Sequence, residues 1–498
     1  MLWELWEDFI GISVKKKMKN RGKNLTSAIN LSLGEFDDLE KYFSKLEKLV
    51  LFPTESQKPT RLPVLKDYLI QGIGPLFEEL GYNLEILENP INGCGPVLLA
   101  TRDEGAALTV LGYGHGDVIL GQEGLWEKGR NPWKLEIDGK RVYGRGTADN
   151  KGQHLTHLTA LKSVLKVRGS LGFNHRFVIE MGEENGSKGF RQLVQEKKEK
   201  FSADVFFASD GPRSEINKPN ITLGNRGVLN FDLLCSLRKG GHHSGNWGGL
   251  LANPAIILAN AISTIVDRNG RILVDGISIK KIPKTIKVAL QNISRDGGKY
   301  APEIDPEWGP KNRSIIEKVT ASNSFEVLAI LSGNPESPVN SVPPEARAAC
   351  QLRFVVGTNL NEIIPILRSH LDLHGFNNIT IEEPASSNRI SFEASRTSPD
   401  NPFAEWMQSV ISKACNSPCS VLPNSAGSNM TEVVQYDLKI PIVWLPLSYT
   451  GCSQHAPNEH ILIPLHREGL AIVTEVYWKL GDETEGFKPN ITKPKITT

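Results

Sequence analysis

The sequence has almost no excess of either charge. Its 57 Lys and Arg residues against 56 Asp and Glu leave a formal net charge of +1 over 498 residues. Such a balance gives no whole-molecule field that would attract nucleic acid, an anionic membrane surface or a polyanionic substrate. We therefore expect neither nucleic acid nor a membrane as a partner, and any specificity for a charged ligand must be local.

Cysteine is scarce as well. The six cysteines are scattered, and only Cys415 and Cys419 lie close in sequence, a pattern that favours reduced thiols and a cytoplasmic location. No apolar run approaches the roughly 18 residues of a membrane span. In residues 1–24, acidic residues interrupt the apolar ones and the basic run comes afterwards, the reverse of a secretory signal. We expect a short amphipathic helix or a frayed end there.

The remaining composition, 39% hydrophobic and 23% charged, is that of an ordinary globular protein with a sizeable core. Short apolar runs alternate with helical patterns along much of the chain. This rhythm predicts an α/β fold in which a mainly parallel sheet is flanked by helices.

The pattern changes between residues 224 and 390. Residues 228–237 and 347–356 have the pattern of half-exposed strands. Within residues 358–376, one helical face contains Leu360, Ile363, Ile364, Leu367 and Leu371. We therefore expect an inserted α+β domain at 224–390. It would divide a larger domain into two parts, residues 1–223 and residues 391–498.

Four apolar runs of the larger domain end in polar residues, where open α/β sheets keep their binding crevices. The polar residues near these ends are His115 and Asp117, Glu183 and Glu184, Asp210, and His455. A single histidine or aspartate at a strand end is more often a cap or a turn residue. Several of them at equivalent positions predict a shared site.

Two imidazoles and three carboxylates form the proposed ligand set, which suits Zn²⁺, Mn²⁺ or Co²⁺ and lacks the thiolates of a structural zinc site. The five residues are His115, Asp149, Glu184, Asp210 and His455. A dinuclear site is the simplest interpretation, because the five divide into one bridging carboxylate and two pairs. Asp149 is the candidate bridge, since the glycines of "GRGTADNKG" let its backbone approach the ions closely.

Two further carboxylates suit supporting roles. Asp117 follows His115 by two residues, so it could accept a hydrogen bond from the ring nitrogen that binds no metal. Glu183 could leave the metal to Glu184 and act as the general base on bound water. Four other histidines are interpreted as structural: His154, His157, His175 and His460.

The ordered motifs "GHGDV", "GRGTADNKG", "EMGEENGSKG", "ASDGP", "LGNRG", "HHSGNWGG" and "HAPNEH" carry a family resemblance. The chain resembles the dinuclear metallohydrolases that include aminoacylase, acetylornithine deacetylase, succinyl-diaminopimelate desuccinylase, carboxypeptidase G and carnosine dipeptidase. The resemblance implies a zinc exopeptidase-like catalytic domain that binds two divalent ions per chain. It also implies that His115 and Asp210 hold one ion, that Glu184 and His455 hold the other, and that Asp149 bridges them.

The same resemblance implies Glu183 as the base and a cis peptide bond after Asp149. The inserted domain would be the family's lid and would mediate a homodimer. His243 would then reach the partner subunit's active site and stabilise the oxyanion of the tetrahedral intermediate. The expected activity is hydrolysis of small peptides by a dipeptidase or carboxypeptidase-like mechanism. An N-acyl-amino-acid deacylase on the same site and a non-catalytic binding or scaffold protein on this fold are the alternatives.

The expected substrate contacts are Arg353, Asn424, Gly427 and Ser428. Arg353 ends a strand of the inserted domain where the family has an arginine. Carnosine dipeptidases have an arginine at the position that Asn424 occupies, ahead of a Gly-Ser pair. A neutral amide lacks the charge-assisted grip of an arginine on a carboxylate, so the sequence argues against a carnosinase-like specificity.

Overall fold

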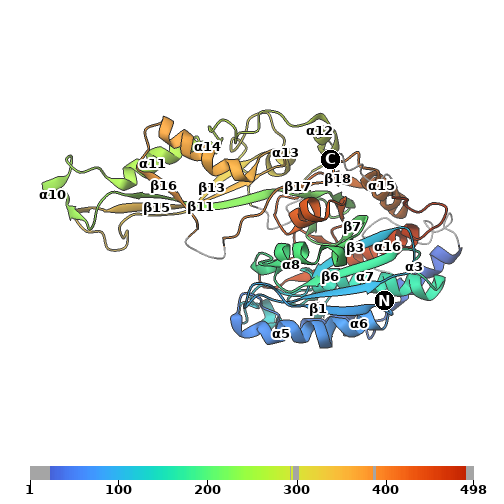
Figure 1. The fold of residues 1–498 in the computed structure, drawn as a ribbon. Coiled ribbons are helices and arrows are strands. Elements are labelled where there is room, and N and C mark those ends of the chain that lie inside the picture. The colour runs from blue at the N-terminus through green and yellow to red at the C-terminus, as the bar shows by residue number, and fades with distance from the viewer. Residues whose placement is uncertain (1–22, 292, 295–301, 385–388, 490–498) are drawn as a thin grey trace.

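The computed structural model describes residues 23–291, 293–294, 302–384 and 389–489. The amphipathic segment expected in residues 1–24 therefore lies almost wholly outside the described residues. Figure 1 shows a body that contains the large sheet and, beside it, an elongated part that carries α10, α11 and α14.

The large sheet has eight strands in the order β1-β2-β6-β3-β7-β19-β9-β18. Their bounds are β1 Asn83–Leu87, β2 Val97–Arg102, β6 Asn174–Glu180, β3 Thr109–His115, β7 Val205–Ala208, β19 Ile442–Trp444, β9 Asn220–Thr222 and β18 Ser420–Leu422. The central strands β6, β3, β7 and β19 are parallel, whereas β1 and β2 are antiparallel to their neighbours. The predicted mainly parallel α/β sheet is confirmed.

Helices cover both faces of this sheet because successive strand residues alternate between the faces. Val110 and Phe207 belong to a core cluster shared with α3, α7, α15 and α16, whereas Leu111 and Phe206 belong to a cluster shared with α8 and η7. The bounds are α3 Lys23–Asp37, α7 Lys151–Arg168, α15 Pro402–Cys415, α16 Ile463–Leu480, α8 Phe190–Glu196 and η7 Val433–Leu438.

Shorter elements complete this body. They are α4 Tyr42–Val50, η3 Pro59–Arg61, α5 Leu62–Asp67, η4 Tyr68–Ile73, α6 Gly74–Glu78, η5 Glu127–Gly129, β4 Glu136–Asp138, β5 Arg141–Tyr143, η6 Glu183–Asn185, α9 Lys198–Phe201, β8 Pro212–Arg213, β20 Ser448–Tyr449 and β21 His460–Leu462. Strands β21, β5 and β4 form a small sheet beside the loop that contains His455.

The inserted region forms its own antiparallel sheet in the order β13-β15-β11-β16. Its elements are β11 Gly227–Ser236, β12 His242–His243, α10 Ser244–Trp247, α11 Pro254–Ile265, α12 Lys284–Leu290, α13 Ile315–Thr320, β13 Ser324–Leu331, β14 Ser341–Val342, β15 Glu345–Phe354, α14 Leu360–Leu373 and β16 Ile379–Glu382. The two strands and the amphipathic helix expected from the sequence correspond to β11, β15 and α14.

We propose residues 1–223, 224–390 and 391–498 as the domain organisation. A second core supports it, since α11 and α14 pack with the four-stranded sheet in a cluster of their own. The chain passes between the two bodies at β10 (Gly224–Asn225) and β17 (Ser395–Arg396), which pair with each other. Helices α12 and α13 of the insert also share an apolar cluster with Leu422 of β18, a contact that the sequence did not indicate.

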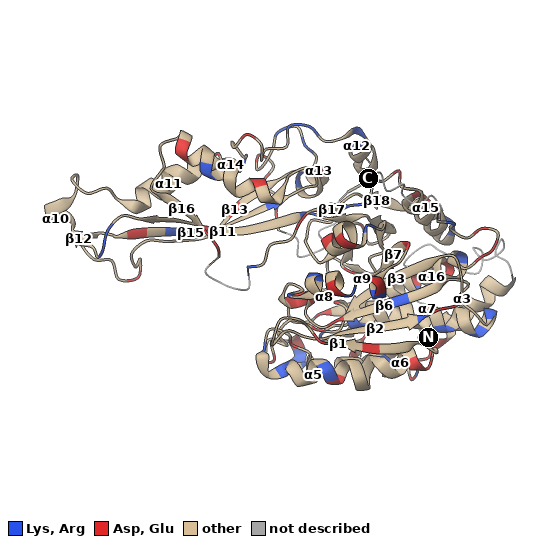
Figure 2. Cartoon of the chain, in the orientation of Figure 1, with Lys and Arg blue, Asp and Glu red and all other residues tan. Residues whose placement is uncertain are grey.

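Charged residues of both signs are interspersed over the two bodies, as Figure 2 shows. This distribution accompanies the near-zero net charge of the sequence. Within the described parts of the chain, no helix combines the length and apolar character that a membrane crossing demands.

The core of the insert gives a stability prediction. Leu367 of α14 is 1% exposed, whereas Leu373 at the end of the same helix is 84% exposed. Leu367→Ala should lower the free energy of unfolding by about 2–5 kcal/mol, because it leaves a cavity among packed side chains. Leu373→Ala is the matched control and should change it by less than about 0.5 kcal/mol. Denaturant unfolding of both variants measures the difference, and equal effects would contradict the assignment of this core.

Candidate metal centre and substrate cavity

The polar residues singled out from the sequence come together at the carboxyl ends of neighbouring strands. His115 ends β3, Glu183 and Glu184 follow β6, and Asp210 follows β7. These three strands are adjacent and parallel, so their ends meet at one edge of the sheet. Asp149 lies two residues before the start of α7.

Asp149 lies between two groups of potential ligands. Its Oδ1 is 2.9 Å from Nε2 of His115, and its Oδ2 is 3.0 Å from Nε2 of His455. Nε2 of His455 is also 3.0 Å from Oε2 of Glu184. One group contains His115, Asp149 and Asp210, and the other contains Asp149, Glu184 and His455, each with its ligand atoms within 4.8 Å of one another. The structure thus brings all five proposed ligands together.

The buried carboxylate of Glu459 holds the loop that carries Asp149. Its Oε1 accepts the backbone N–H groups of Ala148 (2.9 Å) and Asp149 (3.0 Å). Its Oε2 accepts the N–H of Gly146 (2.9 Å) and Nη1 of Arg145 (2.8 Å). The sequence interpretation missed this residue, although it lies inside the quoted motif "HAPNEH", four positions after His455.

Asn150, the next residue of this loop, has two further features. The peptide bond between Asp149 and Asn150 is cis, as the family resemblance implied. The side-chain amide of Asn150 donates to the carbonyl of Ser209 at 2.9 Å and to Oδ1 of Asp210 at 3.3 Å. Asn150 therefore connects the Asp149 loop to the end of β7.

Asp117 contacts the metal group differently from the expectation. Nδ1 of His115 bonds to the backbone carbonyl of Asp117 at 3.1 Å, whereas the Asp117 carboxylate lies 3.5 Å away. That carboxylate instead accepts the backbone N–H groups of Glu183 (3.2 Å) and Glu184 (3.1 Å). Asp117 therefore fixes the turn that presents both glutamates, and its carbonyl orients the imidazole.

The metal group contains three carboxylates and only two imidazoles, so its own side chains do not fully balance its negative charge. Burial raises the pKa of Glu184 to about 7 and that of Asp210 to about 6, and repulsion from Asp149 acts in the same direction. Hydrogen bonds with Asp149 and Glu184 raise the pKa of His455 to about 11. Burial also raises the pKa of Glu183 well above its usual value. Crowded carboxylates with two imidazoles form a donor set that fits divalent cations.

The four histidines interpreted as structural each pair with a tyrosine hydroxyl. The pairs are His154 with Tyr68 (2.7 Å), His157 with Tyr477 (2.7 Å), His175 with Tyr82 (2.6 Å) and His460 with Tyr449 (2.6 Å). Burial lowers the pKa of His157 and of His175 to about 3. The imidazoles of His157 and His175 are therefore neutral, and all four histidines belong to the packed interior.

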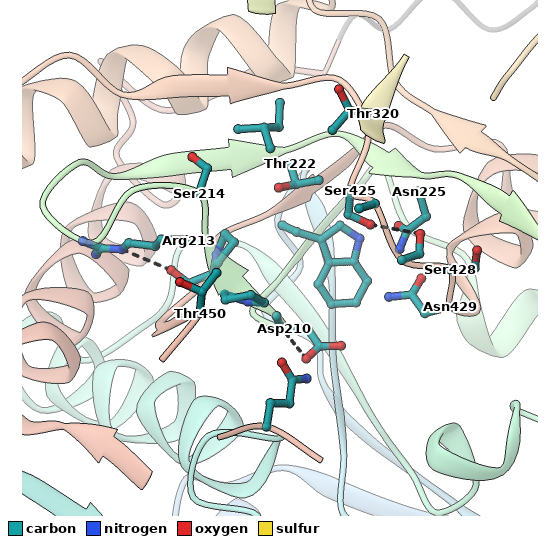
Figure 3. A pocket seen from close by; sticks show the side chains of 18 of the residues that line it. Asp210, Arg213, Ser214, Thr222, Asn225, Thr320, Ser425, Ser428, Asn429 and Thr450 are labelled. Carbon is teal, nitrogen blue, oxygen red and sulfur yellow. Dashed lines mark hydrogen bonds between the residues drawn. The ribbon is translucent and has the colours of Figure 1, made fainter. Parts of the chain in front are cut away.

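A cavity of about 410 Å³ opens beside the metal group. It is bordered by Glu183 and by Gly427, Ser428 and Asn429 of the loop after β18. In the view of Figure 3, Asp210 lies below and Thr222, Thr320 and Ser425 lie above. The cavity therefore extends from the metal group to the underside of the inserted region.

Of the expected substrate contacts, some lie beside the cavity and one is buried away from it. Nη1 of Arg353 donates to the Ser428 hydroxyl at 3.0 Å, so this arginine adjoins the cavity through Ser428. Asn424 is 0% exposed, and its amide donates to the carbonyls of Asn225 (3.0 Å) and Ser395 (2.9 Å). Because Asn424 is buried in the connection between the two bodies and does not border the cavity, we leave it out of the substrate site.

His243 lies far from the metal group of its own chain. It belongs to β12, which pairs with β14 at the end of the insert, and its side chain is exposed. Figure 1 places α10, which follows β12 directly, at the far end of the elongated part, away from the body that contains β3 and β7.

Comparison with known proteins agrees with the fold and the site. The profile of peptidase family M20/M25/M40 matches residues 111–479. A cysteinylglycine-S-conjugate dipeptidase from Corynebacterium striatum is 30% identical over 332 residues, which cover 65% of this chain and 70% of that protein. The human Beta-Ala-His dipeptidase is 37% identical over 254 residues, which cover 50% of this chain and 48% of that protein. This second alignment thus spans about half of each chain.

The structural comparison extends over nearly the whole chain. An M20 family metallo-carboxypeptidase from Sulfolobus solfataricus matches with a TM-score of 0.74 and 25% identity, over 89% of this chain and 99% of that one. The fold and the ligand groups define a metal-dependent hydrolase. The chain belongs to peptidase family M20/M25/M40, because the family profile covers most of its length. The family resemblance of the sequence motifs is confirmed.

The contacts of Glu459 give a testable prediction. A glutamine at this position can accept from only part of the four donors, so Glu459→Gln should lower the free energy of unfolding by about 3 kcal/mol. Because the Asp149 loop loses its anchor, the variant should also retain less metal after dialysis. Exposed Glu336 provides the control Glu336→Gln. Unfolding and elemental analysis check both effects; wild-type stability and metal content would contradict the anchoring role.

Proposed function

We propose that this peptidase is a dipeptidase that hydrolyses the amide bond of small peptides. The observation that carries the proposal is the pair of ligand groups sharing Asp149 at the wall of a cavity of about 410 Å³, which Glu183 also borders. Cavities of this size suit small ligands. The names of the bacterial and human relatives, both dipeptidases, support the same substrate class.

His115 and Asp210 would hold one divalent ion, Glu184 and His455 a second, and Asp149 both. Zn²⁺ is the ion we propose, and Mn²⁺ and Co²⁺ suit the same ligands. Bound ions supply Lewis-acid charge that polarises a carbonyl and lowers the pKa of water. The two oxygens of Asp149, each beside a different histidine, support its shared position.

Glu183 is the residue we propose for proton transfer. Its carboxylate accepts a proton from the attacking water and then delivers it to the amine that leaves, so it acts first as a base and then as an acid. Its place at the cavity wall supports this role. Asp117, which accepts the N–H groups of Glu183 and Glu184, acts as a positioning residue for both.

Arg353, Gly427 and Ser428 are the proposed contacts for the carboxylate end of the peptide. The Arg353 guanidinium adjoins this part of the cavity through its hydrogen bond to the Ser428 hydroxyl. A guanidinium suits a carboxylate, since it can donate two hydrogen bonds to the oxygens. The Ser428 hydroxyl accepts from Arg353 and donates to the backbone carbonyl of Arg226, so it holds the guanidinium beside the cavity.

We further propose a homodimer in which His243 of one chain completes the active site of the other and stabilises the oxyanion. The exposed position of His243 at the end of the insert supports this arrangement. So does β13, an edge strand of the insert sheet on which Leu328, Ile330 and Leu331 are 53%, 59% and 64% exposed. Apolar edge strands are surfaces that pairing with another chain would cover.

The setting we propose is cytoplasmic, supported by the six free cysteines. The alternative functions considered from the sequence, an N-acyl-amino-acid deacylase and a non-catalytic scaffold, gain no support from the relatives, whose names denote peptidases.

Exchanging the proposed base tests the mechanism. Glu183→Gln should keep its metal and lose peptidase activity by a factor of about 10² to 10⁴, the usual contribution of a general acid-base residue. Glu184→Gln is the neighbouring control and should lose metal as well as activity. Elemental analysis and dipeptide turnover measure the two effects. Metal loss in Glu183→Gln but not in Glu184→Gln would reverse the assignments.

Mixing two inactive variants tests the shared site. His243→Ala and Glu183→Gln chains should each be impaired alone. A mixed dimer should regain activity, because one of its two sites then has both an intact base and an intact partner histidine. His242→Ala is the control for an adjacent imidazole. Native mass spectrometry must first verify the mixed dimers, and absence of recovery in them would show that His243 does not act across subunits.

A further inference from the structure

Three side chains of the cavity form a row across the large sheet. Trp444 of β19 is in register with Thr222 of β9, and Thr222 is in register with Leu422 of β18. All three border the cavity. On the other side, Trp444 is in register with Ala208, two residues before Asp210. The row therefore begins beside the metal group and leads away from it.

Helix α13 of the insert covers this row. Ile316, Val319 and Thr320 border the same cavity, and Ile316 shares an apolar cluster with Leu422. Figure 3 shows Thr222 and Thr320 on the side of the cavity that lies away from Asp210. The row and the helix together enclose a part of the cavity that has apolar walls and two threonine hydroxyls.

This part of the cavity offers no counter-ion among the described residues that border it. The charged or ionisable residues on the cavity wall are Arg213 and members of the metal group. Arg213 donates to Oε2 of Glu468 at 2.8 Å, and Figure 3 shows its guanidinium pointing away from the cavity. A charged side chain entering here would lose its hydration without gaining an ion pair.

Trp444 contributes a hydrogen-bond donor with no partner among the described residues. The side chain is 2% exposed, and its ring lies 5.8 Å from that of Tyr113 and 4.9 Å from that of Phe206. These contacts hold the indole in place, yet its buried Nε1–H makes no hydrogen bond there. Buried donors without an acceptor are rare and costly. Beside a ligand cavity, an acceptor on the ligand would satisfy this one.

We propose that Trp444 is a specificity-determining residue, whose indole N–H donates to an oxygen on an uncharged side chain of the substrate. The chemical class is a residue with a short apolar stem and a carboxamide, such as glutamine or asparagine. We place this residue on the acyl side of the scissile bond, because the proposed function assigns Arg353 to the carboxylate at the other end of the peptide. This inference rests on the proposed dipeptidase activity.

The test compares two dipeptides of similar length, Gln-Gly and Met-Gly, which differ in the carboxamide. Trp444→Phe keeps an aromatic ring in the core but removes the donor. It should lower kcat/KM for Gln-Gly by about 3- to 10-fold, the usual effect of one hydrogen bond, and change that for Met-Gly by less than about 2-fold. Calorimetric binding of Gln-Gly in a Glu183→Gln background should weaken by a similar factor. Metal content and thermal unfolding serve as controls.

A second pair of variants tests the uncharged character of the subsite. Wild type should cleave Lys-Gly and Glu-Gly at least about 10-fold less efficiently than Gln-Gly, since neither charge finds a partner. Val319→Asp should selectively improve Lys-Gly, whereas its uncharged control Val319→Asn should not. Equal losses for Gln-Gly and Met-Gly in Trp444→Phe, or no loss in either, would overturn the proposal. If metal-loaded wild type cleaves no dipeptide, the proposed function fails instead.

Discussion

The carboxylate of Glu459 is the contact on which the rest of the site depends. Its Oε1 accepts the backbone N–H groups of Ala148 and Asp149, and its Oε2 accepts the backbone N–H of Gly146 and the side chain of Arg145. A loop that must place one carboxylate between two ligand groups cannot rely on apolar packing alone, because its own polar backbone would be left unpaired. Glu459 satisfies that backbone from within the same loop that contains His455, so one segment anchors the proposed bridge and carries a proposed ligand.

The large sheet sets the positions of the other proposed ligands. Adjacent parallel strands bring their carboxyl ends to one edge, and the ligands follow those ends in sequences that are otherwise far apart. The same edge continues through β19 and β9 toward β18, so the cavity beside the metal group is an extension of the row of proposed ligands. Helix α13 closes it from the insert, which makes the walls of a single cavity come from both bodies.

Much of this arrangement could be predicted from the sequence, because strand ends and glycine-rich turns are local features. The parallel sheet, the strands and helix of the insert, and the meeting of His115, Asp149 and Asp210 follow from such patterns. Contacts set by long-range packing could not be predicted in this way. The anchoring by Glu459, the burial of Asn424 and the packing of α12 and α13 near Leu422 depend on which surfaces meet after folding.

The pairing of buried histidines with tyrosines distinguishes two kinds of imidazole in this protein. An imidazole is a strong ligand wherever it is free, and this interior contains several close to the catalytic sheet. Each of His154, His157, His175 and His460 is already committed to a phenol hydroxyl. The tyrosine hydroxyls therefore engage one ring nitrogen of each of these four imidazoles, whereas Nε2 of His115 and of His455 faces carboxylate oxygens. The protein thus separates the imidazoles that stabilise its interior from the two that face the carboxylates.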